Sequence, residues 1–469
     1  MRHLLLSALP GLGLLLLAGC RGVPSAEERL NRQQVAAVAA RFAASPNLPV
    51  LQPDTGLSNY LAFALLNAPA VRAAYFDWVA AVERVTVERS RPDPVLTFQA
   101  DIADVVMAVM PGLMQELPGP GKLRAAAAVA TAESRAKYFA FAAAVLQTAF
   151  EVKRTAYQLW LLDEQLRLQC ETLVLLAELE AAARAQNAAG KVTLQDVYRA
   201  QIEQDRLATE IANMEDSRRP LLAQFKAALG LHARQPDPPL PARLESTPLA
   251  LEGDALLEAA FRRNPRLQAL EAELQMAEAA IALARKSAVP DFSLGVMADV
   301  NASPVMARPL AGMSLPIWRD KIAAQIARAV AGRDAAAARL SAEQLRFTVD
   351  FALKSFEYRE LTRTLALLEE KLVPKARQSF EIARAGYLAG QVDFFNLLDA
   401  ERTLLSFRLQ AVEARIRREI VLAELSLLIA GLAPANAPLL DPELGPAKPA
   451  ASGPRMATSE PLVTSPSGR

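Results

Sequence analysis

Long stretches of helical periodicity dominate this chain. One helical pattern, which contains no proline or glycine, runs from about residue 123 to residue 188. A second helical pattern runs from about 322 to 388, and Pro374 within it predicts a kink. In the first stretch, leucines recur at the a and d positions of a heptad, as in a coiled-coil seam: Leu159, Leu162, Leu166, Leu173 and Leu176. At ~1.5 Å per residue, such a helix is on the order of 100 Å long. The pattern therefore predicts an elongated helical bundle.

Shorter helices are predicted on either side of the long ones. The first half opens with a helix over about 58–89 and returns through 194–229, and the second half opens over 253–287 and returns through 394–429. The first return helix and the second opening helix together match the length of the first long helix. The opening helix of the first half would complete the stack on the second long helix. This arrangement closes the plan into a circle.

Two apolar stretches without lysine lie between the opening and the long helices, at 95–117 and 292–315. Each has room for two strands of 9–11 residues and a turn. In the second stretch, residues alternate between the two faces of a predicted strand. One face would carry Phe292, Leu294, Val296 and Ala298, and the other would carry Ser293, Gly295, Met297 and Asp299. Four strands leave unpaired edges, whereas three copies supply twelve strands and close a barrel. The predicted fold class is mainly α with a small β part: a long antiparallel α-helical barrel with four transmembrane strands per protomer, closed as a trimer.

An internal repeat supports this plan. Pro118–Lys122 is matched by Pro316–Lys321 at an offset of 198 residues, and Gly190–Val197 is matched by Gly390–Leu397 at an offset of 200. The predicted organisation is a signal peptide over 1–19, an N-terminal segment over 20–56, two repeats over 57–252 and 253–432, and a disordered Pro-, Ala- and Ser-rich tail over 433–469.

Composition and charge exclude several functional classes. The net charge of +1 gives no reason to expect a nucleic-acid partner. The two histidines, His3 and His232, are far apart, so the chain offers no histidine-based metal site and no histidine general base. No Gly-rich phosphate loop or Ser/His/Asp grouping is present. We therefore predict no catalytic residue, no metal and no cofactor, and we expect Cys170 to be a small buried residue on a helix.

The N-terminus resembles that of a bacterial lipoprotein. Arg2 precedes an apolar run that is too short to span a bilayer. The run ends in Leu-Ala-Gly-Cys, which resembles a lipobox and implies that Cys20 is acylated and becomes the mature N-terminus. Arg21 after the cysteine implies the outer membrane. The alternative is an ordinary signal peptide with an incidental cysteine.

The two predicted turns carry a more specific resemblance. Tyr387–Asp393, followed by Leu397–Arg402, resembles the periplasmic tip of the TolC-type outer membrane factor family, and the likeness covers roughly Asn59–Leu432. With Cys20, it points to the lipoprotein branch. The resemblance implies a homotrimeric channel, held in outer-membrane lipid, that conducts solutes passively. It also implies a periplasmic adaptor (a membrane fusion protein) and an inner-membrane pump that supplies energy and substrate choice.

Residues at the two turns have both structural and functional interpretations. Glycine ends helices in the left-handed conformation, and Thr193 and Asp393 are placed to cap the helices that follow. The resemblance implies that the adaptor is contacted by Gly190, Val192, Asp196, Gly390, Val392 and Asn396. Asp399 is a candidate gate residue, and Asp196 is a second one. Capping or exposed pairing is the alternative role of these acids.

One rival function stays open: a periplasmic coiled-coil lipoprotein with a structural or adaptor role. It accounts for the long helices and for Cys20, but it does not predict two apolar segments at equivalent places in a repeat. The exported substrate is also open. Pro118–Lys122 resembles the corner of family members associated with heavy-metal export, yet the chain has no His or Met cluster to form a metal path.

Overall fold

The computed structural model describes residues 24–43, 48–102, 106–241, 253–300, 302, 304–432 and 439. The predicted signal peptide and Cys20 lie outside these residues, as does the predicted disordered tail except for Leu439. Leu439 departs from that prediction, because its side chain is buried in a core cluster with residues of α5 (Pro69–Arg89).

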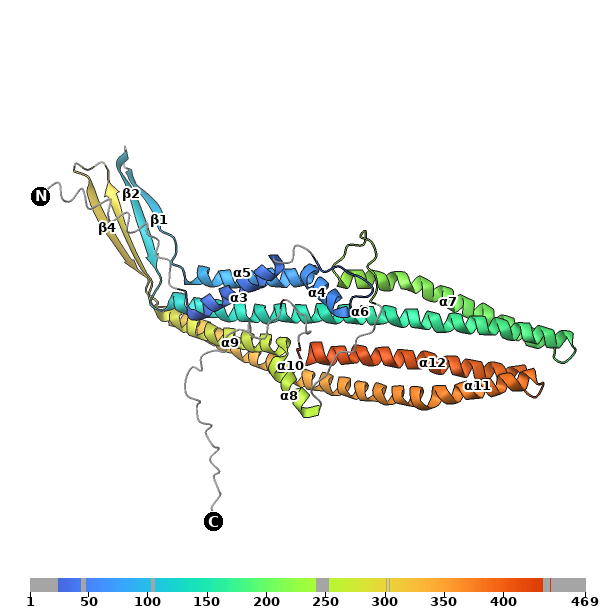
Figure 1. Ribbon diagram of the computed structural model, residues 1–469. Helices are drawn as coiled ribbons and strands as arrows, with labels where there is room; N and C mark the ends of the chain where they lie inside the picture. The colour runs from blue at the N-terminus through green and yellow to red at the C-terminus, as the bar shows by residue number, and fades with distance from the viewer. Residues whose placement is uncertain are drawn as a thin grey trace, which may run out of the picture.

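One helix runs the length of the molecule and organises the rest (Figure 1). This helix, α6 (Lys122–Ala188), packs along α7 (Leu194–Ala228) toward one end of the molecule and along α5 and α9 (Pro265–Arg285) toward the other. Its buried residues include Leu159, Leu162 and Leu176 of the predicted heptad seam. The stacking of the first return helix and the second opening helix on α6 is therefore confirmed.

The second long helix is continuous but not uniform. It comprises α10 (Arg319–Leu367), a π-helical turn η2 (Leu368–Leu372) and α11 (Val373–Leu388). Pro374 is the second residue after the π turn. Since proline has no N–H to continue the hydrogen-bond ladder, a wider turn takes up the mismatch at the predicted kink. The chain then returns through α12 (Phe394–Ala423) and a second π turn, η3 (Glu424–Ile429).

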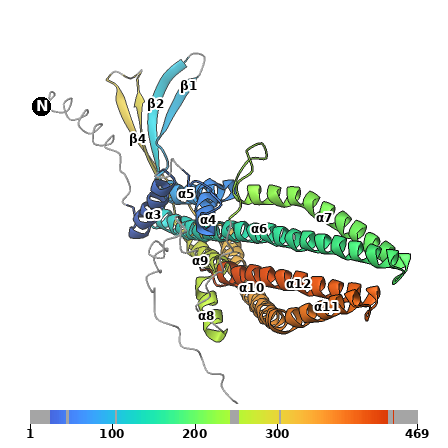
Figure 2. The same cartoon turned by 45° about the vertical axis from the view of Figure 1, so that its right-hand side comes forward.

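A four-stranded antiparallel sheet stands at the end of the molecule away from the two helical turns (Figures 1 and 2). Its strands, in spatial order, are β1 (Val95–Ile102), β2 (Val106–Leu117), β3 (Phe292–Asp299) and β4 (Met306–Met313). Each predicted apolar stretch forms one hairpin, and the two hairpins join through β2 and β3. The strand pairs are therefore confirmed.

The sheet has one apolar face, which we define by side chains that the strand register places together: Leu96, Phe98, Leu113, Phe292, Leu294, Val296, Ala311 and Met313. Phe98 and Leu294 are 71% and 54% exposed. On the opposite face of β3, Met297 and Asp299 are buried, which matches the predicted alternation. β1 and β4 form the two outer edges of the sheet.

Both opening helices are broken, whereas the sequence predicts each as a single helix. The predicted single helix over 58–89 is α4 (Leu57–Asn67) and α5, separated at Ala68. The one over 253–287 is α8 (Gly253–Arg263) and α9, separated at Asn264. In each case a proline takes the first position of the second helix, where its missing N–H costs nothing, and it drives the preceding residue out of the helical conformation.

Each break forms a joint with the end of a return helix. The Asn67 side-chain amide donates to the carbonyl oxygens of Leu229 and Gly230, at 3.0 Å each. In the second repeat, the Asn264 amide donates to the last two carbonyls of η3, at 2.9 and 3.1 Å. Asn264 also caps α9, because its Oδ1 accepts from two backbone N–H groups of that helix. The two joints fix where the stacked helices meet.

We expect Asn264→Ala to destabilise the protein by about 2 kcal/mol, because it removes a helix cap and leaves buried carbonyls without their donor. Thermal unfolding of the purified protein measures this change. Gln268→Ala is the control: the Gln268 amide also donates to a backbone carbonyl, at 2.8 Å, but that hydrogen bond is exposed to solvent, so its loss should change stability little. Equal losses in the two variants would contradict the role of the joint.

The predicted N-terminal segment contains a helix, α3 (Ala26–Ala43), whose buried Glu28 lies 2.8 Å from Arg89 of α5 and whose Arg32 lies 2.8 Å from Glu83. A second feature differs from the prediction. Cys170 is exposed rather than buried, since it falls on the outer side of α6.

The predicted circle does not close within one chain. α5 lies on one side of α6, while α9 and α10 lie on the other (Figures 1 and 2). The opening helix therefore does not complete the stack on α10 in this chain, and α10 keeps an exposed apolar row, Leu345, Val349, Leu353 and Phe356.

Candidate functional site

The candidate site is the helical tip, where the α6–α7 and α11–α12 hairpins end together (Figure 1). Leucines, Phe394 and Tyr387 from all four helices form one core cluster there. The rings of Tyr387 and Phe394 lie edge to face with centroids 5.4 Å apart. The two predicted turns thus belong to one packed unit.

The two turns have the predicted glycine conformation. Gly190 and Gly390 have φ of 71° and 76°, and no atom would contact a β-carbon at either position. Asp393 caps α12 by accepting from the Asn396 N–H at 2.8 Å. Thr193 occupies the equivalent position but makes no side-chain cap. The predicted capping is therefore confirmed for Asp393 and wrong for Thr193.

The other predicted contact residues divide between packing and surface. Val392 packs against Gly386, where an added β-carbon would lie 2.5 Å from its Cγ2, and Val192 packs on the tip core. Asn396 and Asp399 are exposed and share with Val392 an open groove of about 410 Å³ between α11 and α12. Asp196 is half-buried, 3.9 Å from Arg199.

Polar contacts join the two hairpins. The Arg402 guanidinium of α12 donates hydrogen bonds of 2.7 and 2.8 Å to the two carboxylate oxygens of Glu203 on α7. Nearer the turns, the Gln186 amide donates to the Tyr387 carbonyl at 3.2 Å. Because Glu203 is buried, this bidentate pair is the strongest polar link between the hairpins.

A second buried carboxyl lies beside this pair. Glu401 is 3% exposed, and burial, reinforced by the neighbouring Glu203 charge, raises its pKa to about 7. Arg402 acts in the opposite direction. From α7, Arg206 lies 3.6 Å from Glu203, and Glu210 lines the same shallow pocket. The tip thus contains a carboxyl that changes its charge near neutral pH.

Sequence reasoning missed Glu203, Glu401 and Tyr387 as site residues. Glu401 and Arg402 fall within the motif that carried the family resemblance, but Glu203 is about 200 residues away in sequence. No local pattern marks Glu203 as the partner of Arg402, because charged residues are frequent on every helix.

The Tyr387 hydroxyl is buried and, within the part of the chain that the structure describes, has no hydrogen-bond partner. We expect Tyr387→Phe to be neutral or slightly stabilising, because it removes only that hydroxyl. Tyr387→Ala should cost about 3–5 kcal/mol through the cavity that it leaves in the tip core. Unfolding of both variants in detergent measures the difference, and a large loss in Tyr387→Phe would contradict this account.

The tip also exposes apolar side chains. Leu194, Tyr198 and Ile202 lie four residues apart on α7 and are each more than half exposed. On α12, Phe395 is also exposed, with the Arg199 guanidinium 5.8 Å from its ring centroid. These side chains give the tip a surface suited to contact with another protein.

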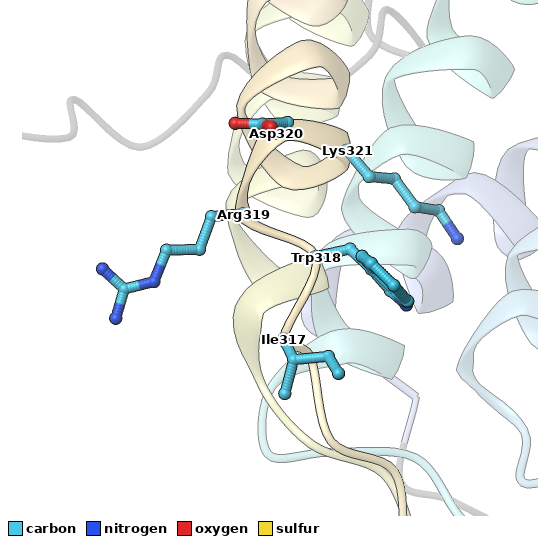
Figure 3. Close-up of a pocket in the computed structure, with 5 residues that line it drawn as sticks. All are labelled: Ile317, Trp318, Arg319, Asp320 and Lys321. Carbon is cyan, nitrogen blue, oxygen red and sulfur yellow. The ribbon is translucent and has the colours of Figure 1, made fainter.

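At the opposite end, short corners connect the sheet to the long helices. Trp318, at the start of α10, is 71% exposed. Figure 3 shows that Trp318 and Lys321 extend to the same side of this corner and Arg319 to the other. An exposed tryptophan with flanking cations is typical of a membrane–water boundary.

Two features are absent from the residues that the structure describes. No helix among them contains an apolar stretch long enough to cross a bilayer. No cluster of His, Cys, Asp or Glu side chains among them is arranged to hold a metal ion.

Comparisons with known proteins agree with this architecture. The family model described as outer membrane efflux protein matches residues 61–231 and 256–431. The cobalt-zinc-cadmium resistance protein CzcC of Cupriavidus metallidurans is 26% identical over 273 residues, which is 55% of this chain and 62% of CzcC. The match thus spans less than two thirds of that relative.

Solved structures show the same fold at low sequence identity. The outer membrane protein VceC of Vibrio cholerae superposes with a TM-score of 0.68 at 18% identity, over 80% of this chain and 96% of VceC. The open state of the MtrE outer membrane channel of Neisseria gonorrhoeae gives 0.67 at 18% identity, over 84% of this chain and 96% of MtrE.

Proposed function

Because this chain belongs to the outer membrane efflux protein family, we propose that it forms the outer-membrane channel of a tripartite efflux system. A periplasmic adaptor and an inner-membrane pump would deliver the solute, and the channel would conduct it passively to the exterior. Energy and substrate choice would come from the pump.

The exposed sheet is the main observation that supports this proposal. Its apolar face is exposed, and its two outer strands, β1 and β4, are unpaired in a single chain. A sheet with open edges is unstable in lipid, because no water replaces the missing hydrogen bonds. Three copies would pair every edge in a closed barrel of twelve strands.

The helices support the same assembly. The exposed apolar row on α10 has the spacing of one helix face. On the other side of the chain, α5 exposes Phe76. Packing α5 of one copy against α10 of the next would bury both surfaces and close the helical circle, which one chain leaves open.

Conductance across a planar lipid bilayer tests the proposal. The purified protein should form discrete channels, and a threefold particle with a detergent belt at one end should be visible by electron microscopy. Rods without a belt and without conductance would favour the lipid-tethered coiled coil instead.

A matched pair of variants tests the assignment of the faces. Phe98→Arg puts a charge on the apolar face, and Gln99→Arg puts the same charge on the other face of the same strand. An arginine facing lipid costs about 2–4 kcal/mol at the bilayer centre. We therefore expect Phe98→Arg to lose outer-membrane insertion and export while Gln99→Arg keeps both.

The tip is the proposed adaptor contact, through Gly190, Val192, Asp196, Gly390, Val392 and Asn396, with Asp399 as a gate acid. The position of Asn396 and Asp399 in an exposed groove supports this role. A photo-crosslinking residue at Asn396 should capture the adaptor in cells, while one at Val174, which is exposed farther along α6, should not.

Lipid anchoring at Cys20 is also proposed, and Cys20→Ala should abolish metabolic labelling with palmitate. For the substrate, we propose divalent metal ions, on the basis of the named function of CzcC. Restored cobalt, zinc or cadmium tolerance in a strain that lacks its own channel tests this. Restored tolerance to organic compounds alone would contradict it.

A further inference from the structure

One ionic clamp joins the two repeats at the foot of the sheet. The Lys122 ammonium lies 2.8 and 2.7 Å from the two carboxylate oxygens of Asp291. Asp291 also accepts from the Gly119 N–H at 2.7 Å. Lys122 begins α6 just after β2, and Asp291 immediately precedes β3. The clamp therefore holds together the feet of the two central, paired strands.

The two repeats place a second lysine and a second aspartate at equivalent positions. Val95 is opposite Met114 in the first hairpin, and Ser293 is opposite Gly312 in the second. Both members of the second pair are 198 residues beyond those of the first. At the same offset, Asp93 corresponds to Asp291, and both follow a proline.

The helices identify the second lysine. The tip glycines of the two repeats are 200 residues apart. The π turn η2 accommodates one extra residue in the second repeat, so equivalent positions of the long helices between η2 and the strands are 199 residues apart. Lys122 then corresponds to Lys321. The corner before α10 is one residue longer than the corner before α6, which restores the offset of 198 in the strands.

These second partners lie at opposite edges of the sheet. Asp93 precedes β1, Lys321 follows β4, and both are exposed. Within the described residues, neither side chain makes a hydrogen bond or an ion pair. One chain therefore carries one complete clamp and two separated halves of another.

Because the proposed trimer brings β4 of each copy beside β1 of the next, we propose that Lys321 of one copy pairs with Asp93 of the next and sets the register of that strand pair. Transferring the β2–β3 register by the repeat offset places Ala311 opposite Phe98 of the next copy, and Met313 opposite Leu96. This inference rests on the proposed trimeric channel.

Face matching supports this register independently. Ala311, Met313, Leu96 and Phe98 all belong to the apolar face in their own hairpins. A slip of one residue would turn one strand over and place apolar against polar positions. A slip of two would preserve the faces but separate Lys321 from Asp93. The ion pair thus selects one register among those that the faces allow.

Cysteine pairs test the register in a Cys170→Ala background, which removes the exposed native thiol. Phe98→Cys with Ala311→Cys should give disulfide-linked dimers and trimers on non-reducing gels. Leu113→Cys with Val296→Cys, the equivalent pair inside one chain, should form a disulfide within the chain and give no ladder of dimer and trimer bands. Phe98→Cys with Met313→Cys, which corresponds to a two-residue slip, should give little ladder. A ladder mainly from the slipped pair would overturn the register.

Charge reversal tests the ion pair. Asp93→Lys and Lys321→Asp should each lower the temperature at which the detergent-solubilised trimer dissociates, and the double reversal should restore it. Arg319→Asp reverses a cation on the other side of the same corner and should have little effect. A double reversal no better than the single ones, or coupling of Asp93 to Arg319 instead, would overturn the pairing.

The mass of the unsubstituted protein in detergent separates the two levels of inference. A trimer without these couplings would refute the Lys321–Asp93 pair and leave the channel intact. A monomer would refute both.

Discussion

Arg402→Ala is expected to weaken the packing of the helical tip by about 3 kcal/mol, because it leaves the buried Glu203 without its bidentate partner and next to Glu401. Arg408→Ala is the matched control. Arg408 likewise joins the two hairpins, because it lies on α12 at 3.2 Å from Glu171 of α6, but that partner is about half exposed. An exposed pair contributes about 1 kcal/mol or less.

Amide hydrogen exchange in α7 and α12 measures this loss, because it reports the local opening of the tip. Glu401→Gln in the Arg402→Ala background should recover part of it by removing one of two adjacent buried carboxyls. Equal exchange in Arg402→Ala and Arg408→Ala would contradict this role of the Arg402–Glu203 pair.

The same cluster predicts a dependence on pH. The pKa of Glu401 rises from 4.5 to about 7 on folding, so the folded tip binds the proton more tightly than the unfolded chain does. Its contribution to stability is complete below about pH 4.5 and is lost as the pH rises to about 7, a difference of up to about 3 kcal/mol. Glu401→Gln should remove this dependence and give slower exchange above pH 7. Exchange compared at equal pH in the two proteins tests it.

Gly431→Ala is the second change with a large expected effect, a loss of about 3 kcal/mol in the free energy of unfolding. Gly431 has φ of 64°, and an added β-carbon would lie 2.6 Å from the Arg263 carbonyl oxygen. Left-handed strain and a backbone clash therefore act together. The neighbouring backbone cannot rotate away, because Asn264 holds the same joint.

Two other glycines provide matched controls. Gly390→Ala carries the same φ strain without a contact and should cost about 1 kcal/mol. Gly332→Ala lies inside α10 with open space around it and should stabilise the chain by about 1 kcal/mol. Urea unfolding should rank the variants in this order. A Gly431→Ala loss no larger than that of Gly390→Ala would show that the joint can relax.

Sequence alone determined the long helices, the strand pairs and the glycine turns. These features depend on local rules: a period of 3.6 or of 2, a proline that ends a helix, a glycine that adopts a positive φ. The repeat extended their reach, because it showed that the two halves share one plan. The family resemblance added the functional expectation at the tip.

Local rules were less reliable where two signals competed. The helices predicted over 58–89 and 253–287 run through Pro69 and Pro265, but each of these prolines begins a new helix after a break. Thr193 has a capping side chain, yet the short turn supplies the hydrogen bond from backbone, since the Asp196 N–H donates to the Thr193 carbonyl at 3.2 Å.

Only the tertiary structure decided which distant side chains meet. The pairing of Glu203 with Arg402, the burial of Glu401 and the two asparagine joints each bring together residues that are 160 to 200 positions apart. A linear pattern gives the face of a helix but not the rotation and register at which two helices pack. Those follow from the fit of side chains in the core, and so the polar contacts of the tip emerge only in the folded chain.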